Sequence, residues 1–286
     1  MPVFDVHTHV FPDAIAARTV AKLGAVAKIE PAYDGSRDGL LRSMTAAGID
    51  GALNCPIATR PDQVESIVAW AAANHRWPVL SLASIHPDSP RPESILRKIK
   101  EAGLPGIKLH PEYQEFTLDD PRMKPIWQAC RDHDLLIMLH AGADVAFSPP
   151  FRSAPAAIVA LIETYPGLKL IAAHGGSWNM WEEVMRTMAG APVFIDTSFT
   201  LGLLDDERFL ALVRKHGPAR VLFGTDAPWR RQARDLQHFI RLPLSESEQK
   251  LVLWENAARL LALPDIENRS TRPDCARRPD TSNLNP

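Results

Sequence analysis

The sequence predicts one α/β domain, in which parallel strands alternate with helices and close into a barrel. Short apolar runs typical of strands alternate with helical runs along residues 4–263, and parallel neighbours need such crossover helices. The chain has 286 residues, 45% of them hydrophobic, which suits a barrel of about 250 residues. Histidines end several of the strand-like runs, so one end of this barrel is the expected functional end.

Eight strands are predicted, and eight is the number at which alternating strands and helices close into a (β/α)8, or TIM, barrel. Each run is short and mostly apolar, as buried strands are. The predicted strands are residues 4–10, 51–57, 79–85, 106–110, 135–140, 168–174, 193–196 and 220–226.

The helices between them carry recognisable start and stop signals. Gly48 and Gly103 end two helices, Asp120 precedes a proline as an N-cap, and Ser245 with Glu248 forms a capping box. The predicted helices are residues 40–47, 61–75, 92–102, 121–133, 154–165, 178–188, 206–216 and 245–263.

Two stretches depart from this repeat. Residues 142–153 are long for a strand-to-helix loop and contain two adjacent prolines, which suggests a lid or a substrate loop. Residues 264–286 are polar and rich in proline, so we expect a disordered C-terminal tail after a barrel domain of residues 1–263.

Composition excludes several classes of function. Lys and Arg number 32 against 34 Asp and Glu, so no basic surplus favours nucleic acid or an anionic membrane. No apolar stretch approaches the roughly 20 residues of a membrane span, and the N-terminus shows no secretory signal. The three cysteines are odd in number and widely spaced, which favours a reducing cytoplasm over a disulfide framework.

Imidazole and carboxylate side chains recur where the predicted strands end. His7 and His9 share one face of the first strand because side chains alternate with a period of two. A single histidine at a strand end is more often structural, and His86 stays ambiguous for that reason. Five strands that end in this way indicate a metal or catalytic site, and the further members are His110, His140, His174 and Asp226.

The motifs around these residues resemble the amidohydrolase superfamily. Within it they are most similar to the amidohydrolase-related branch that includes aminocarboxymuconate-semialdehyde decarboxylase. The resemblance covers the chain up to residue 263. It rests on DVHTH (5–9), GIKLHP (106–111), AHGG (173–176), LFGTDAP (222–228) and WENAARLL (254–261).

The resemblance implies a divalent metal ion, with zinc as the expected metal. The implied ligands are His7, His9, His140 and Asp226. His174 is then either an acid/base beside a single metal or a ligand of a second one.

Lys108 and His110, on the fourth strand, are the other residues for a second metal or for substrate. Lys108 is either a carbamylated bridge between two metals or a buried ammonium paired with a carboxylate such as Asp196.

Such a site implies metal-assisted hydrolysis of an amide, lactone or ester in a small molecule, with Asp226 and His174 as the catalytic acid/base groups. The alternative is non-oxidative decarboxylation of an unsaturated or aromatic acid at the same site. A third interpretation is an inactive binding protein on the same barrel. The partner is a small molecule in each case, and a homodimer is compatible with the sequence.

A cation for the substrate's carboxylate would favour decarboxylation. Arg60, Arg152 and Arg230 follow strand ends and are candidates, although surface arginines are common. Trp178 and Trp229 are candidates for the pocket wall, or simply for packing.

Overall fold

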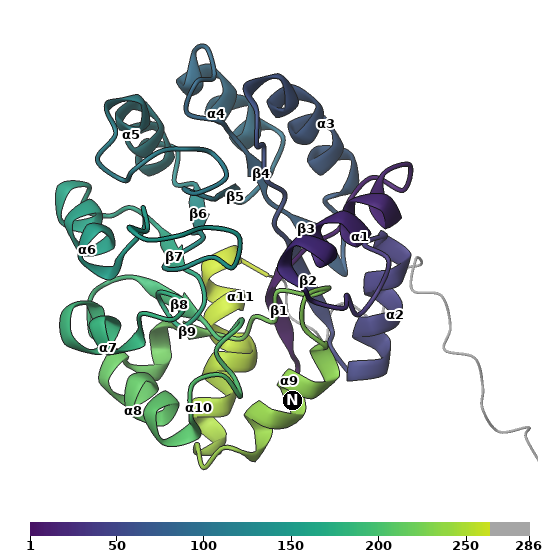
Figure 1. The fold of residues 1–286 in the computed structure, drawn as a ribbon, viewed down its shortest axis with the longest axis vertical. Helices are drawn as coiled ribbons and strands as arrows, with labels where there is room; N and C mark the ends of the chain where they lie inside the picture. Colours follow the sequence, from purple (N-terminus) through teal and green to yellow (C-terminus); the bar gives the residue numbers. More distant parts are fainter. Residues whose placement is uncertain (264–286) are drawn as a thin grey trace, which may run out of the picture.

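The computed structural model places the strands in a ring, with the helices around them (Figure 1). It describes residues 1–263, so the predicted tail lies outside the described residues. The strands are β1 (Phe4–Thr8), β2 (Gly51–Asn54), β3 (Val79–Ser81), β4 (Ala83–Ser84), β5 (Gly106–Leu109), β6 (Leu136–Leu139), β7 (Leu170–Ala172), β8 (Phe194–Asp196) and β9 (Val221–Leu222). Together, β3 and β4 make up one predicted strand.

The strand pairing confirms the parallel barrel. All ladders between the named strands are parallel, in the orders β1-β2-β3 and β4-β5-β6-β7-β8-β9. Backbone hydrogen bonds join the two sheets at both seams. Leu82 N donates to Asn54 O at 2.9 Å, and Val6 N donates to Phe223 O at 2.9 Å.

The helices form the outer layer. They are α1 (Ala16–Ala27), α2 (Arg37–Ala47), α3 (Val64–Asn74), α4 (Pro92–Glu101), α5 (Lys124–Asp132), α6 (Pro155–Thr164), α7 (Trp181–Glu183), α8 (Asp206–His216), α9 (Gln232–Arg241), α10 (Glu246–Lys250) and α11 (Asn256–Leu261). Shorter helical turns are η1 (Pro61–Gln63), η2 (Pro121–Met123), η3 (Val184–Met188), η4 (Pro218–Arg220) and η5 (Leu251–Glu255). None of the helices within residues 1–263 has the length and apolar character to cross a membrane.

The predicted caps are present, while two helices were not predicted. Ser245 and Glu248 form the expected capping box, Asp120 caps η2 through Arg122 N, and Gly48 ends α2 with φ 75°. Helices α1 and α9 add to the predicted set. The last predicted helix is divided into α10, η5 and α11, because η5 is a wider π-helical turn.

The apolar core fills the interior and the N-terminal end of the barrel, and polar residues occupy the opposite end. Alternate strand residues, among them Phe4, Leu53 and Met138, form a buried apolar cluster. Trp254 packs edge-on against Phe4, with 6.3 Å between ring centroids. Phe4 begins β1, so this aromatic contact covers the N-terminal end of the barrel, and the polar residues gather at the opposite end.

Candidate metal centre and active site

The strand ends bring the predicted site residues to one mouth, because all the strands run parallel. Each of these side chains is buried. His7 lies in β1 and His9 directly follows it, and the others follow later strands: His110 after β5, His140 after β6, His174 after β7 and Asp226 after β9.

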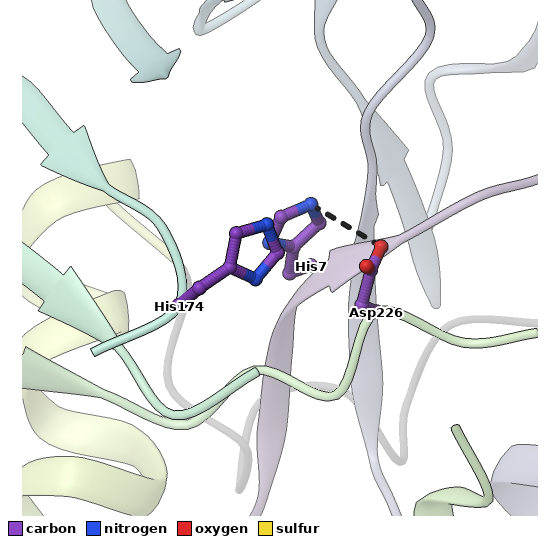
Figure 2. Close-up of side chains that lie close together, drawn as sticks. All are labelled: His7, His174 and Asp226. Atoms are coloured by element: carbon purple, nitrogen blue, oxygen red, sulfur yellow. Dashed lines mark ion pairs between the residues drawn. The ribbon is translucent and has the colours of Figure 1, made fainter. Parts of the chain in front are cut away.

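A first group consists of His7, His174 and Asp226, whose potential ligand atoms all lie within 4.8 Å of one another. Figure 2 shows the two imidazoles and the carboxylate facing a common space. Asp226 Oδ1 is 3.4 Å from His7 Nε2 and 2.7 Å from His9 Nε2. His9 therefore borders the same group, as its place on the face of the first strand predicted.

His7 is oriented by a carboxylate on the other side of its ring. Its Nδ1 donates to Asp196 Oδ2 at 2.8 Å, and Asp196 ends β8. This contact leaves the Nε2 lone pair aimed at the first group, which is the arrangement that metal-binding histidines use. Burial first, and then the neighbouring Lys108 ammonium, lower the pKa of His7 to about 4, so the ring is neutral at neutral pH.

Lys108 lies on the Nε2 side of the His7 ring, the side that faces the first group, and Asp196 lies on the Nδ1 side. Its Nζ is 3.0 Å from His7 Nε2, and within residues 1–263 it forms no ion pair with Asp196, whose side chain is taken by His7 and Ser198. Lys108 is thus not at ion-pair distance of Asp196 in the described residues, and the two alternatives for it, a carbamylated bridge or an ammonium near a carboxylate, stay predictions. Burial is the largest influence on the Lys108 ammonium and lowers its pKa.

The surroundings of the Asp226 carboxylate indicate whether a cation fits the first group. Its Oδ1 atom is buried, and its nearest partners are two imidazole nitrogens, His9 Nε2 at 2.7 Å and His7 Nε2 at 3.4 Å. Burial alone would raise the pKa of this carboxyl, but the imidazoles of His7 and His9 that face it outweigh burial and hold the pKa below its ordinary value. A buried carboxylate needs a proton donor or a cation beside it, and a divalent cation shared with these imidazole nitrogens would fill that role.

Distances in the first group also suit a metal ion. Ligand bonds of about 2.0–2.1 Å in a tetrahedron put ligand atoms about 3.3–3.4 Å apart. The 3.4 Å between His7 Nε2 and Asp226 Oδ1 matches that separation, while the 2.7 Å between His9 Nε2 and Asp226 Oδ1 is shorter.

Backbone strain marks the same positions. His174 and Asp226 both adopt left-handed backbone, with φ 64° and 63°, which costs about 1–3 kcal/mol for each such residue. Asp196 Oδ1 accepts from His174 N at 2.9 Å, and His7 O accepts from Asp226 N at 2.7 Å. These bonds hold both side chains toward the mouth.

A chain of contacts runs from Asp196 through Ser198, His174 and His140 to the carbonyl oxygen of Ala143. Ser198 Oγ donates to Asp196 Oδ1 and is 2.8 Å from His174 Nδ1. His174 Nε2 is 3.1 Å from His140 Nδ1, and His140 Nε2 is 3.0 Å from Ala143 O.

Both ends of this chain of contacts are hydrogen-bond acceptors, so only the three groups between them can supply protons for its hydrogen bonds. Four contacts join the five groups, while one hydroxyl and two neutral imidazoles supply one proton each. Burial lowers the pKa of both His140 and His174, so both are neutral. One of the four contacts therefore lacks a proton.

His140 belongs to a second group, with His110 and Asp144. Asp144 Oδ2 is 3.3 Å from His110 Nε2 and 3.9 Å from His140 Nε2. The rings of His110 and His140 stack, with centroids 3.9 Å apart and an interplanar angle of 13°. The structure thus places the His140 ring between the two groups, with Nδ1 toward His174 and Nε2 toward Asp144.

The candidate arginines all have partners. Arg60 is exposed and pairs with Asp62 at 3.0 Å. Arg152 pairs with the buried Glu112 at 3.2 Å. The third candidate, Arg230, pairs with the buried Asp235 at 2.7 Å and lies over the Phe199 ring.

The candidate tryptophans are both half-buried. Trp178 packs edge-on to Phe199, 6.3 Å between centroids, and Phe199 in turn contacts His174 at 6.0 Å. Trp229 follows Asp226 in a tight turn, in which Trp229 N donates to Asp226 O. The first of these contacts places Trp178 near the mouth.

The sequence analysis did not predict that Asp196, Ser198 and Asp144 contact the histidines of the candidate site. Asp196 and Ser198 stand at a strand end like the histidines, and that position was the available signal. Asp144 lies in the loop after β6, four residues after His140, and nothing local distinguishes it from a solvated aspartate.

A parallel α/β barrel with buried imidazoles and a carboxylate at its C-terminal mouth defines a class of metal-dependent enzymes. The sequence profile of the Amidohydrolase family matches residues 4–263. The chain therefore belongs to this family, whose members use divalent metal ions. A comparison with curated proteins gave no match.

Solved structures share the fold. An uncharacterized TIM-barrel protein from Bordetella bronchiseptica has a TM-score of 0.74 at 19% identity and covers 92% of this chain and 99% of its own. A Pseudomonas putida protein assigned as a 2-pyrone-4,6-dicarboxylic acid hydrolase has a TM-score of 0.64 at 16% identity and covers 91% and 97%. The 5-carboxyvanillate decarboxylase of Novosphingobium aromaticivorans, complexed with manganese, has a TM-score of 0.68 at 16% identity and covers 92% and 96%. At these identities the likeness establishes the fold.

Proposed function

We propose that this protein is a metal-dependent hydrolase that cleaves an amide, lactone or ester bond in a small molecule. The observation that carries the proposal is the buried Oδ1 of Asp226, which faces two imidazole nitrogens, His9 Nε2 at 2.7 Å and His7 Nε2 at 3.4 Å. We assign His7, His9 and Asp226 as ligands of a divalent metal, and zinc is the metal that suits this imidazole-rich set best.

When bound, the metal supplies Lewis-acid activation of water and of the scissile carbonyl oxygen. Asp196 keeps the His7 lone pair directed at the site through the 2.8 Å bond to Nδ1. Asp226 takes the proton of the attacking water on its second oxygen and passes it to the leaving group.

His174 is the second acid/base group in this proposal. It lies within 4.8 Å of Asp226 and His7, and its chain of contacts has one position without a proton. His174 can therefore take up a proton that would otherwise remain on Asp226, with Ser198 and Asp196 orienting its ring.

The arginines favour hydrolysis over decarboxylation. A decarboxylase needs a cation placed for the substrate's carboxylate, and Arg60, Arg152 and Arg230 are all paired with acids. One observation supports decarboxylation as the second candidate. Lys108 has no carboxylate at ion-pair distance within residues 1–263, so it remains the cation that could hold such a group.

Product analysis separates the candidates. Zinc-loaded and manganese-loaded protein is incubated with a panel of lactones, amides, esters and unsaturated acids. Hydrolysis places one oxygen of ¹⁸O-labelled water in the product acid, whereas decarboxylation releases carbon dioxide and leaves the organic product unlabelled.

The control variants make the result specific. Asp226→Asn should abolish turnover, whereas His86→Asn, which changes another strand-end histidine, should keep it. Carbon dioxide release without label uptake would replace our proposal by the decarboxylase. Full metal content without any turnover would favour a binding protein.

We also propose a cytoplasmic location, which the cysteine pattern supports. Cys55 and Cys130 are buried and free, and such thiols persist in a reducing compartment.

A further inference from the structure

The carbonyl group of His9 is held by a side chain from another part of the chain. Strand β1 ends at Thr8, so the backbone of His9 lies beyond the strand. His9 N donates to Ala227 O at 2.6 Å, and the Tyr33 hydroxyl donates to His9 O at 2.9 Å. A buried carbonyl group outside a strand ladder needs such a donor. Tyr33 therefore completes the backbone bonding of a proposed metal ligand.

The ring of His9 has no second anchor, unlike the ring of His7. His7 Nδ1 donates to Asp196 Oδ2 at 2.8 Å. His9 Nε2 faces Asp226, and its Nδ1 makes no hydrogen bond to residues 1–263. Metal-binding histidines usually have an acceptor on the far ring nitrogen. Because His9 lacks one among the described residues, the direction of its ring depends on where its backbone lies, and Tyr33 holds one of its two backbone groups.

Tyr33 lies in the connector between α1 and α2, residues 28–36, which also contacts the turn after β9. Ala32 N donates to Pro228 O at 2.7 Å, and Pro228 lies two residues after Asp226. Adjacent residues of the connector therefore bond to the backbone of one proposed ligand and to the turn that carries another.

The turn at Gly35 keeps Tyr33 in that position. Gly35 has φ 77°, a left-handed conformation that favours glycine, and a Cβ atom there would collide with Val20 Cγ2 of α1. Phe11 N donates to Gly35 O at 2.9 Å. The connector is thus held against α1 and against the segment after β1, so the Tyr33 hydroxyl reaches His9 from a fixed support.

We propose that Tyr33 is a positioning residue of the metal centre, which acts on the ion through the backbone of His9. The inference rests on the proposed function, because it takes His9 as a ligand of the divalent ion. The hydroxyl fixes the carbonyl group of the residue whose imidazole binds the ion. Removing the hydroxyl frees this backbone to move and leaves a buried carbonyl without its donor. Both effects weaken the hold of His9 Nε2 on the ion.

Tyr33→Phe tests the proposal, because it keeps the ring and removes only the hydroxyl. The full-length protein is stripped with a chelator, and its zinc affinity is measured by competition with a fluorescent zinc chelator. One neutral hydrogen bond corresponds to about 2–10-fold in an equilibrium constant, so zinc binding should weaken by more than about twofold.

Tyr165→Phe is the matched control. Tyr165 is also half-buried, and its hydroxyl makes no hydrogen bond within residues 1–263. This variant should bind zinc as the wild type does. Circular dichroism verifies that both variants are folded.

Zinc affinity separates positioning from a purely structural role. A group that only stabilises the fold affects the zinc-free and zinc-bound protein equally, so its loss leaves the dissociation constant unchanged. Tyr33→Phe should instead lower the thermal midpoint of the zinc-bound protein more than that of the zinc-free protein. Cobalt-loaded protein gives a spectroscopic signature, because the visible absorption bands of Co²⁺ report the ligand geometry. These bands should shift in Tyr33→Phe and stay unchanged in Tyr165→Phe.

Amide hydrogen exchange tests the same coupling in the wild type, in case Tyr33→Phe does not fold. Zinc should slow exchange in a peptide that covers residues 28–36, although the connector supplies no ligand, because coupling between two sites is reciprocal. A peptide that covers Tyr165 should exchange at the same rate with and without zinc.

Three results would overturn the inference: a folded Tyr33→Phe whose zinc affinity stays within about twofold of the wild type, a cobalt spectrum that does not shift, or connector exchange that does not respond to zinc. A wild type that binds no zinc would overturn the ligand assignment and this inference together. Zinc bound without hydrolysis would count against the proposed function alone, and Tyr33→Phe would still decide the role of Tyr33.

Discussion

Asp196→Asn is the sharpest test of how the site is held together. The Asp196 carboxylate is not itself a proposed metal ligand, but it orients one, the His7 imidazole. Four donors face this carboxylate: His7 Nδ1, His174 N, Ser198 N and Ser198 Oγ. An amide keeps one oxygen and replaces the other with an NH₂ group. In either orientation, the NH₂ group of the asparagine therefore faces at least one hydrogen-bond donor, and that hydrogen bond is lost.

The magnitude follows from these contacts. The 2.8 Å bond to His7 is in the range of charge-assisted hydrogen bonds, which contribute about 1.5–3 kcal/mol against about 0.5–1.5 kcal/mol for neutral ones. If the amide oxygen still faces His7, the loss of about 1–1.5 kcal/mol weakens metal binding about 5–10-fold. If the NH₂ group faces His7, the ring must carry its proton on Nε2, and the loss should reach about 100-fold.

Competition with a fluorescent zinc chelator measures this affinity, with circular dichroism and thermal unfolding to verify the fold. Asp235→Asn is the matched control, because Asp235 is also a buried carboxylate but pairs with Arg230. That variant should bind zinc as the wild type does. A folded Asp196→Asn whose zinc affinity stays within about threefold of the wild type would refute the assigned role of Asp196.

Three further predictions concern single histidines and Asp226. His7→Ala and Asp226→Ala should each strip the first metal while the barrel stays folded, and His86→Ala should not. His174→Ala should keep that metal yet lose about 10²–10⁴ in turnover, as expected for an acid/base group; a loss of metal would make His174 a ligand. Burial lowers the pKa of His216 to about 4 from 6.5, so its neutral form contributes stability that is present above pH 6.5 and lost as pH falls toward 4. In His216→Gln the number of protons taken up on unfolding in that pH window should fall by about one, so the free energy of unfolding should depend less on pH. An unchanged dependence would contradict this prediction.

The two helices that the sequence analysis missed, α1 and α9, bury small or polar side chains among their apolar ones. In α1 the buried positions are Ala16, Val20 and Gly24, so small side chains form much of its buried face. In α9 two of the four buried residues are Gln232 and Asp235. Gln232 donates to the distant Asp5, and Asp235 pairs with Arg230 in the turn before the helix, so polar residues occupy positions where an apolar pattern was sought.

The candidate site was predictable where the strands themselves placed the residues. Strand ends and the period of two were enough to bring His7, His9 and Asp226 to one mouth. His140 was predicted to join them, and that ligand role stays a prediction. In the structure its Nδ1 lies 3.1 Å from His174 Nε2 and its Nε2 lies 3.0 Å from Ala143 O, in the loop after β6. The choice of partner on each side of an imidazole ring is a tertiary property, so the sequence carried no signal for it.

The hydrogen bonds that close the barrel between β1 and β9 also position the candidate metal ligands. At the seam, Asp226 N donates to His7 O and His9 N donates to Ala227 O, at 2.7 and 2.6 Å. Asp5 strengthens the seam by accepting from Thr225 N at 3.0 Å and Thr225 Oγ1 at 2.5 Å. The bonds that join β1 to the end of β9 therefore also set the spacing of the metal ligands. A substitution that loosens this seam should weaken metal binding and lower stability together, whereas one at His174 should leave both in place.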